Sequence, residues 1–272
     1  MIPTRRIADI GISAHRGASI ERPENTLAAF RLAIDHGAEG IELDVALSAD
    51  GVPVIMHDNS VERTTNGTGE VAGLTAAQLH ALDAGHGEGV PTLHEVLELA
   101  AGLVEVNIEI KSADAAPAVA EVLARHPNLD WFASGGQWGA LEALKQLIPA
   151  ARIFPLTTGV GDWQALRVHA IASGYSLDLI DREVARFSDL GRTLDDALEF
   201  AERVGAAGLS IWEDRLEAQH IDRVHAANLE AWVWTTNDPD RAEQLMRMGV
   251  DGICTDDPAG ILARRARVAE SA

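Results

Sequence analysis

The sequence predicts an α/β fold, a TIM-type barrel in which parallel strands alternate with helices. Short apolar runs recur between longer amphipathic stretches, which is the pattern of strands joined by helical crossovers. Eight such runs can be placed along the chain, and this number favours a closed barrel over an open sheet. The length of 272 residues and the apolar content of 47% suit one domain that covers residues 1–272.

The expected strands and helices follow from local patterns. We place the strands at residues 10–14, 39–45, 104–110, 130–134, 152–156, 207–211, 231–235 and 251–254. The clearest helix covers residues 24–37, where Asn25 can cap the first turn, apolar residues recur at helical spacing and Gly37 ends the helix. Strand, helix and strand therefore alternate from the start of the chain.

Two connections are longer than a simple crossover requires. The first, residues 47–92, follows the second strand. It opens with the short extended piece VPVIMHD and closes where Pro91 starts the helix TLHEVLELA. The second, residues 157–206, follows the fifth strand and includes an extra helical segment over residues 157–192. Long segments of this kind in a barrel usually cover the site or make contacts elsewhere.

Composition limits the possible partners and the compartment. The 42 acidic and 22 basic residues give a net charge of −20, which repels polyanions, so we expect no nucleic-acid partner. Cys254 is the only cysteine, so no intrachain disulfide is possible and a reducing compartment fits. The first residues lack the apolar run of a signal peptide, and no window resembles a transmembrane segment. We therefore expect a cytoplasmic protein.

Two of the expected strands carry charged residues on one face. In GIELDVAL, strand alternation places Glu42 and Asp44 opposite an apolar face. In VNIEIKS, the same alternation places Glu109 and Lys111 opposite the isoleucines. Because the apolar faces can pack against the helices, the charged faces should point into the barrel near the C-terminal ends of the strands. Barrel enzymes carry their active sites at this end.

Three inward carboxylates need a compensating partner. Burying each charge costs several kcal/mol unless it is paired or bound to a metal, and one lysine cannot neutralise three carboxylates. A hard divalent cation, Mg²⁺ or Ca²⁺, suits the oxygen ligands of Glu42, Asp44 and Glu109. The alternative is a structural salt-bridge cluster or a set of solvent-facing charges. Two strands with matching phase favour the metal site.

Two histidines stand where phosphoryl transfer would need them. His15 closes the first strand in HRG, and His57 follows the second strand in MHD. Histidine titrates near neutral pH, so such a pair can act as general base and general acid on a phosphodiester. Arg16 can bind phosphate oxygens, and Lys111 can stabilise the negative charge of the transition state. The other histidines lack comparable neighbours.

Seven successive motifs between residues 14 and 258 resemble those of the glycerophosphodiester phosphodiesterase (GDPD) family, within the superfamily of phospholipase C-like phosphodiesterases. In chain order they are AHRGASIERPENTLAAF, GAEGIELDVALSADGVPVIMHD, RTTNGTG, PTLHEVL, NIEIK, WVWTTND and MGVDGICTDDP. The resemblance implies a TIM-type barrel with the residues already singled out: a divalent metal at Glu42, Asp44 and Glu109, acid–base catalysis by His15 and His57, and phosphate contacts from Arg16 and Lys111.

The resemblance also implies a reaction on a small-molecule glycerophosphodiester. The neighbouring hydroxyl of the glycerol attacks phosphorus, the alcohol leaves, and water opens the cyclic phosphate to give glycerol 3-phosphate. Trp234 would form an apolar wall beside the glycerol, although core packing explains an indole at this position equally well.

Other marks in these motifs have structural interpretations. In PENT, a turn followed by a helix cap explains residues 23–26, which we expect to steady the loop that carries Arg16. Asp256 points toward the same rim of the barrel or caps the next turn. Cys254 is expected to be a small buried hydrophobe.

The chain departs from the family pattern at three places. After the fourth strand, Ser134 matches the family but Gly135 replaces an aromatic residue. The insertion over residues 47–92 is shortened, whereas the segment over residues 157–192 is enlarged. We hypothesise that the enlarged segment forms a lid, with contacts from Trp163, Tyr175 or Phe187. A dimerisation patch, and hence a homo-oligomer, or simple surface decoration are equal alternatives.

Two other functions stay open. A lysophospholipase D or sphingomyelinase D-like phosphodiesterase would release a cyclic phosphate as its product. A catalytically inactive barrel would only bind phosphodiesters. The inactive barrel predicts the loss of a catalytic residue, and the sequence lacks none of them.

Overall fold

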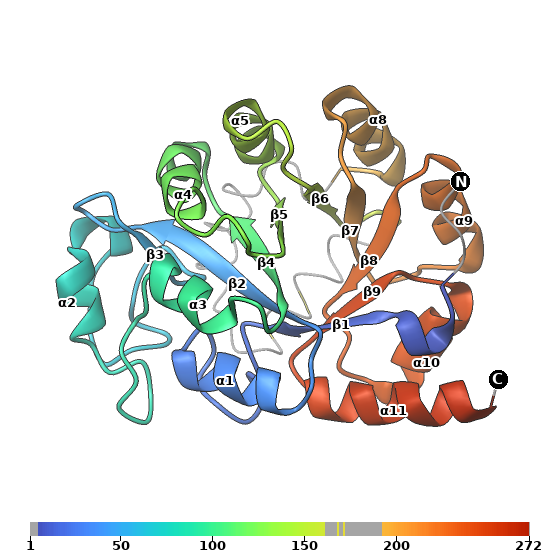
Figure 1. The fold of residues 1–272 in the computed structure, drawn as a ribbon, viewed down its shortest axis with the longest axis horizontal. Helices are drawn as coiled ribbons and strands as arrows, with labels where there is room; N and C mark the ends of the chain where they lie inside the picture. Colours follow the sequence, from blue (N-terminus) through green and yellow to red (C-terminus); the bar gives the residue numbers. More distant parts are fainter. Residues whose placement is uncertain (1–4, 161–167, 169–170, 172–191, 272) are drawn as a thin grey trace.

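The computed structural model describes residues 5–160, 168, 171 and 192–271 of the chain. Eight parallel strands form a closed barrel, since β1 pairs with both β2 and β9 (Figure 1). The barrel strands are β1 (Gly11–His15), β2 (Gly40–Leu47), β4 (Glu105–Ile110), β5 (Trp131–Gly135), β6 (Ile153–Thr157), β7 (Gly208–Trp212), β8 (Glu230–Trp234) and β9 (Gly252–Thr255). The TIM-type barrel and its eight predicted strands are confirmed.

Helices surround the barrel on its outside (Figure 1). They are α1 (Leu27–Asp35), α3 (Leu93–Ala100), α4 (Ala116–Leu123), α5 (Trp138–Leu147), α8 (Leu194–Val204), α9 (Ala218–Ala226), α10 (Pro239–Met248) and α11 (Pro258–Ser271), with short helices η1 (Ile7–Asp9), η3 (Ala113–Ala115), α2 (Ala76–His80) and η2 (Val71–Gly73). Two large apolar clusters fill the space between strands and helices. In the described part of the chain, no helix combines the length and the apolarity that crossing a bilayer requires.

Strand alternation divides each barrel strand between two environments. On β2, Ile41 and Leu43 are fully buried in the outer apolar cluster, so Glu42 and Asp44 face the interior. One aromatic cluster, Phe132, Phe154 and Trp232, fills the interior nearer the N-terminal strand ends. The charged side chains therefore stand above an apolar floor, toward the C-terminal ends of the strands.

The start of helix α1 corrects one prediction. Thr26, and not Asn25, caps this helix, because the Thr26 hydroxyl accepts a hydrogen bond from the backbone N–H of Ala29. Asn25 has a φ of 59° and turns its side chain toward β2 instead. At the other end, Gly37 adopts a φ of +86° just past the helix, as predicted.

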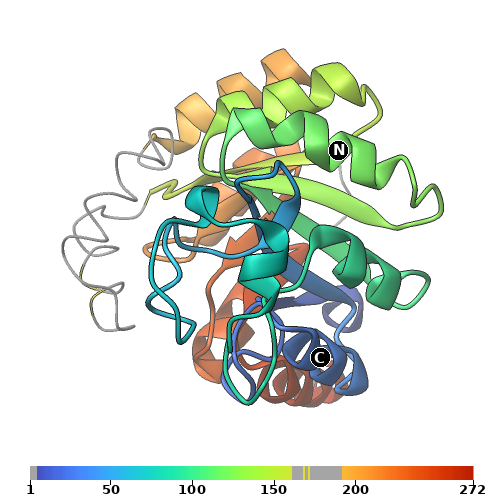
Figure 2. The same cartoon turned by 90° about the vertical axis from the view of Figure 1, so that its left-hand side faces the viewer.

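The connection over residues 47–92 folds back along β2. Its extended piece becomes strand β3 (Pro53–Ile55), which pairs antiparallel with β2. The rest includes η2 and α2 and packs around a small apolar cluster of its own; in Figure 2 this cyan segment lies in front of the barrel. Helix α3 begins after Thr92, whose side chain forms a capping box with Glu95, so Pro91 lies just before the helix and does not start it.

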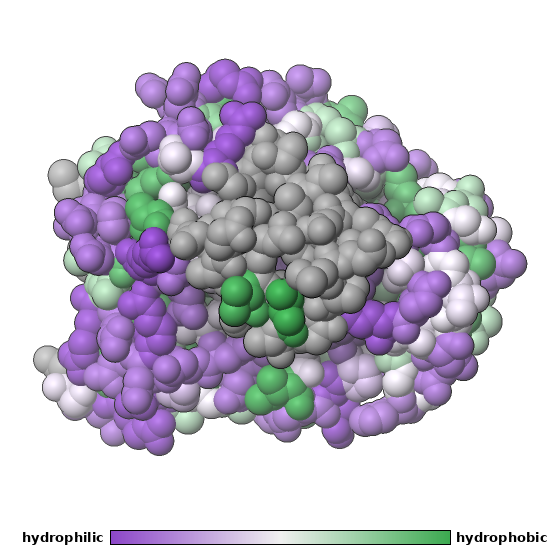
Figure 3. Space-filling model, turned by 180° about the vertical axis from the view of Figure 1, so that it is seen from behind, coloured by the Kyte–Doolittle hydropathy of each residue, from purple (hydrophilic) through white to green (hydrophobic). Residues whose placement is uncertain are grey.

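The described surface is largely hydrophilic on the face shown in Figure 3, in keeping with the net charge of −20. The segment after β6 was predicted to hold extra helical pieces and a lid. Its candidate contacts Trp163, Tyr175 and Phe187 lie outside the described residues.

Candidate active site

The carboxylates that were predicted to share a cavity lie together. Glu42, Asp44 and Glu109 are buried, and one oxygen from each lies within 4.8 Å of the others. The parallel pairing of β2 with β4 produces this arrangement, because Asp44 stands directly opposite Glu109. Three carboxylate oxygens at this separation form a donor set that a hard divalent cation prefers.

Lys111 lies among these carboxylates, one residue beyond the end of β4. Its Nζ is 2.6 Å from Asp44 Oδ1 and 2.7 Å from Glu109 Oε1. The side chain is only 1% exposed. Burial lowers the pKa of Lys111, but the charges of Asp44 and Glu109 outweigh it and raise the pKa, so the ammonium stays charged.

Arg16 is held in a tight turn directly after β1. Its φ is 58°, and Gly17 follows with a φ of +85°, where a Cβ would come within 2.6 Å of the backbone of Ala29. The Arg16 backbone N–H donates to the Glu42 carboxylate at 3.0 Å, and its Nε lies 3.1 Å from Asp44 Oδ2. The Arg16 side chain therefore lies directly beside the carboxylates of β2.

The two carboxyls of β2 have opposite pKa shifts. Burial and the nearby charges of Asp44 and Glu109 raise the pKa of Glu42 to about 8. Burial also opposes ionisation of Asp44, but Lys111 and Arg16 hold the pKa of Asp44 well below its usual range. Without a metal, Asp44 is therefore held ionised, whereas the protonated form of Glu42 is favoured at neutral pH.

One oxygen of Glu42 lacks a hydrogen-bond partner in the part of the chain that the structure describes. Glu42 Oε1 is buried and finds no partner among the described residues, although Oε2 accepts from Arg16. Leaving a buried acceptor unsatisfied costs roughly 1–3 kcal/mol. A cation bound by Glu42, Asp44 and Glu109 would give this oxygen a partner and would favour the ionised form of Glu42, so the residues present fit a divalent metal.

His15 ends β1 and contacts a carboxylate from the opposite end of the chain. Its Nδ1 lies 2.7 Å from Asp256 Oδ1, a contact made possible by the pairing of β1 with β9. Ser19 and Asn237 both donate hydrogen bonds to Asp256 and fix its orientation. Burial and Arg16 lower the pKa of His15, but Asp256 outweighs them and the pKa is raised.

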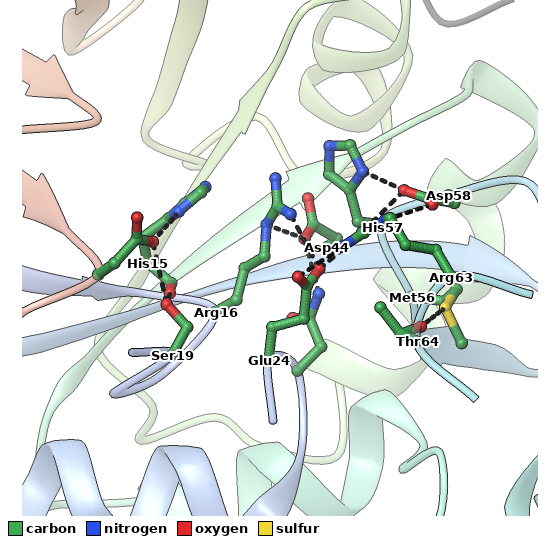
Figure 4. A network of polar contacts seen from close by, with 12 residues as sticks. His15, Arg16, Ser19, Glu24, Asp44, Met56, His57, Asp58, Arg63 and Thr64 are labelled. Atoms are coloured by element: carbon green, nitrogen blue, oxygen red, sulfur yellow. Dashed lines mark hydrogen bonds and ion pairs between the residues drawn. The ribbon is translucent and has the colours of Figure 1, made fainter. Parts of the chain in front are cut away.

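His57 follows β3 and contacts its neighbour in sequence. Its Nδ1 lies 2.7 Å from Asp58 Oδ1, and Arg63 donates to the same carboxylate (Figure 4). Burial and the positive charges of Arg16 and Lys111 lower the pKa of His57 to about 3. His57 is therefore neutral at physiological pH, whereas the pKa of His15 shifts in the opposite direction.

The sequence patterns did not predict the contacts that four residues of this network make. Asn25 was expected to cap a helix but donates to Asp44 Oδ2 at 2.8 Å. Asp256 contacts His15, while its neighbour Asp257 accepts the hydrogen bond at the start of α11. Asp58 and Arg63 lie inside the quoted motifs MHD and RTTNGTG, so only their contacts were missing from the sequence.

Among the described residues, the Trp234 side chain forms no hydrogen bond with the charged cluster. It ends β8, is half-buried, and its Nε1 is buried without a hydrogen-bond partner among the described residues. Close packing explains why glycine stands at position 135, where the family pattern has an aromatic residue. A Cβ at Gly135 would lie 2.9 Å from the carbonyl oxygen of Ile110. An aromatic side chain would not fit at this position without a shift of the backbone.

Comparison with known proteins agrees with this arrangement. The Glycerophosphoryl diester phosphodiesterase family matches the sequence over residues 15–260. A glycerophosphodiester phosphodiesterase from Caldanaerobacter subterraneus is 32% identical over 263 residues, which cover 92% of this chain and 96% of the relative.

Solved structures show the same fold over nearly the whole chain. A phosphodiesterase of Oleispira antarctica in complex with the product sn-glycerol-3-phosphate has 28% identity and a TM-score of 0.76, covering 93% of this chain and 96% of its own. A glycerophosphodiester phosphodiesterase from Agrobacterium tumefaciens has 28% identity and a TM-score of 0.71, covering 93% and 99%. The chain therefore belongs to the glycerophosphoryl diester phosphodiesterase family, a family of phosphoric diester hydrolases.

Proposed function

We propose that the protein hydrolyses glycerophosphodiesters to an alcohol and glycerol 3-phosphate. One observation carries the proposal: two histidines with opposite pKa shifts, each paired through Nδ1 with a carboxylate, adjoin one arginine and the buried carboxylate cluster. In Figure 4, Arg16 stands between His15 and His57. The product bound by the relative from Oleispira antarctica, sn-glycerol-3-phosphate, supports this choice of product.

The opposite shifts suggest which histidine is base and which is acid. Neutral His57 takes the proton of the glycerol hydroxyl as the hydroxyl oxygen attacks phosphorus and forms a cyclic phosphate. Protonated His15 gives its proton to the oxygen of the leaving alcohol as the P–O bond breaks. In the second step the roles reverse: water adds its hydroxide to phosphorus, His15 takes the water proton, and His57 returns its proton to the glycerol oxygen.

Other side chains stabilise charge and position the substrate. Arg16 and Lys111 offset the negative charge that develops on the phosphate oxygens. Trp234 provides an apolar wall beside the glycerol. Glu42, Asp44 and Glu109 would hold Mg²⁺ or Ca²⁺, and such a cation lowers the pKa of a hydroxyl that it contacts and neutralises phosphate charge.

The test is release of glycerol 3-phosphate from a panel of glycerophosphodiesters with Mg²⁺, Ca²⁺ or a chelator. We expect metal-dependent release that His15→Ala reduces by at least roughly 100-fold, since general acid–base catalysis contributes about that much. Glu42→Ala should also reduce it strongly, because it removes one of the carboxylates that would hold the metal. Accumulation of a cyclic phosphate as the final product would instead indicate the lysophospholipase D or sphingomyelinase D-like alternative. Tight ligand binding without turnover would contradict the proposal and support a binding protein.

A further inference from the structure

We infer that Arg63 is a positioning residue for the reaction, because its guanidinium holds Asp58 and Glu24 together and through them fixes His57 and Arg16. The inference rests on the proposed function, in which His57 is the base and Arg16 binds phosphate. It gives the RTTNGTG turn a task in catalysis that is separate from any contact with the substrate.

The guanidinium of Arg63 forms a fork that meets two carboxylates at once. Toward Asp58, its Nε is 2.7 Å from Oδ2 and its Nη2 is 2.9 Å from Oδ1. Toward Glu24, its Nη1 is 2.7 Å from Oε2 and its Nη2 is 2.8 Å from Oε1. Only a planar guanidinium offers donors in this geometry, since the ammonium of lysine is a point charge.

On one side, Arg63 controls the proton of His57. The Asp58 side chain is only 1% exposed, and its Oδ1 is shared between Arg63 and His57 Nδ1. Burial raises the pKa of Asp58, but the hydrogen bonds from His57 and Arg63 outweigh it and hold the carboxyl ionised. An ionised Asp58 can only accept, so Nδ1 of His57 carries the proton and Nε2 carries the lone pair that a base needs.

On the other side, Arg63 fixes the partner of Arg16. Glu24 Oε1 accepts from both Arg63 Nη2 and Arg16 Nη1, the latter at 2.9 Å (Figure 4). Burial opposes ionisation, but the two arginines lower the pKa of Glu24 to about 2. Glu24 therefore bridges two guanidiniums. Without Arg63 it is free to rotate, and Arg16 loses one of the carboxylates that orient its guanidinium, although the contact with Asp44 stays.

The segment that carries Arg63 is itself well fixed. The Thr65 hydroxyl donates to the backbone oxygen of Val61 at 2.7 Å, and the backbone N–H of Val61 donates to Gly69. Val61 is fully buried in the small apolar cluster of residues 47–92. The connection after β2 thus holds one rigid donor group against both halves of the site.

Substitution of Arg63 tests the inference kinetically. We expect Arg63→Ala to lower kcat/KM about 10- to 100-fold, as loss of an orienting partner commonly does. Added guanidinium should restore part of this loss, whereas Arg63→Lys should stay nearly as slow as Arg63→Ala. Arg203→Ala is the matched control, because Arg203 also donates two hydrogen bonds to one carboxylate, that of Glu142, but on the exposed outer surface. The kcat/KM of this variant should stay within twofold of the wild type and should not respond to guanidinium.

A double-mutant cycle separates positioning from general stabilisation. In an Asp58→Asn background, Arg63→Ala should cost less than in the wild type, because both changes act through His57. The inference is wrong if Arg63→Ala leaves kcat/KM within twofold of the wild type. It is also wrong if the fold-losses in kcat/KM of Arg63→Ala and Asp58→Asn simply multiply in the double variant and added guanidinium restores no activity. Should Arg63→Ala not fold, Arg63→Lys carries the kcat/KM comparison and the double-mutant cycle, while the guanidinium test is then left out.

A second measurement does not need turnover. The His57 Nδ1 proton should give a hydrogen-bonded signal in the proton NMR spectrum, assigned by its loss in Asp58→Asn. In Arg63→Lys we expect this signal to broaden or disappear, and an unchanged signal would overturn the inference. If the wild type hydrolyses no phosphodiester while this signal responds to Arg63, the proposed function fails and the positioning of His57 by Arg63 stands.

Discussion

At the residue scale, carboxylates define the site, because they orient neighbouring side chains and change their pKa values. Asp256 and Asp58 each contact the Nδ1 of a histidine, yet the pKa values of the two histidines shift in opposite directions. The difference comes from the surroundings. Burial lowers the pKa of both histidines; at His57 the cations Arg16 and Lys111 lower it further, whereas at His15 Asp256 outweighs burial and Arg16. Similar carboxylate partners thus accompany opposite pKa shifts.

Replacing the carboxylate of Asp256 with the amide of asparagine tests its role. Asp256→Asn removes the charge that raises the pKa of His15, so we expect kcat to fall roughly 10- to 100-fold. As a general acid, His15 is active only while protonated, so activity falls as pH rises through its pKa. In Asp256→Asn this fall should move to lower pH in a kcat–pH profile. Asp257→Asn, which alters only the start of α11, should leave the profile unchanged.

The raised pKa of Glu42 predicts how metal and pH together affect the stability of the protein. Its pKa of about 8 in the metal-free protein exceeds the usual value of about 4.3, so the stability it contributes is present below pH ~4.3 and is lost as pH rises toward 8. A bound cation favours the ionised form. We therefore expect Mg²⁺ or Ca²⁺ to raise the melting temperature more at about pH 8 than at about pH 6.

The control for this prediction is Glu42→Gln, which resembles the protonated carboxyl. Its metal-free stability should vary less between these pH values, and added metal should stabilise it weakly at both. Equal stabilisation of the wild type at both pH values would contradict the assignment of Glu42 as a metal ligand that must lose a proton.

At the element scale, small residues on the strands let the aromatic floor form. At Gly252 of β9, a Cβ would come within 2.4 Å of the Trp232 ring, and at Gly208 of β7 it would come within 2.2 Å of Phe154. These rings fill the barrel below the charged cluster. The strands can therefore close around them only where no side chain intervenes.

Gly252→Ala is expected to lower the free energy of unfolding by about 1–3 kcal/mol, because overpacking forces ring or backbone to shift. Gly139→Ala is the matched control, since a Cβ at Gly139 on α5 meets nothing within 4 Å and alanine favours the helix by up to about 1 kcal/mol. Denaturant unfolding measures both. A Gly252→Ala protein as stable as the wild type would show that the floor can adapt.

At the scale of the whole molecule, the two ends of the barrel carry different tasks. The charged cluster lies toward the C-terminal strand ends, whereas Arg152 crosses the opposite end and joins Glu105 of β4 to Glu230 of β8. Its guanidinium also lies 5.7 Å from the ring centres of Phe132 and Phe154. This group ties strands from two sides of the closed sheet together.

Arg152→Met should therefore separate stability from activity. We expect a loss of about 1–2 kcal/mol, modest because the guanidinium is partly exposed to solvent. kcat/KM should stay within about twofold of wild type, because the change is remote from the reacting groups. Parallel measurement of melting temperature and turnover checks this. A large loss of activity in a protein that is still folded would mean that the two ends are coupled.

Much of this arrangement was predictable from the sequence. Strand alternation is a local property, so GIELDVAL and NIEIK placed Glu42, Asp44 and Glu109 inward before any packing was known. The same holds for the eight strands and for the extended piece that became β3. The capping role of Asn25 was wrong, because an adjacent threonine fills that role equally well and the sequence alone cannot separate them.

The sequence by itself determined the barrel, its inward carboxylates and its two histidines, because each depends on periodicity or on neighbours along the chain. Only the tertiary structure decided which carboxylate each side chain meets. His15 meets Asp256, 241 positions away, because the sheet closes β1 onto β9, and Arg63 meets Glu24, 39 positions away, because the connection after β2 folds back. Such contacts depend on how the barrel closes and its turns fold, and no local pattern records that geometry.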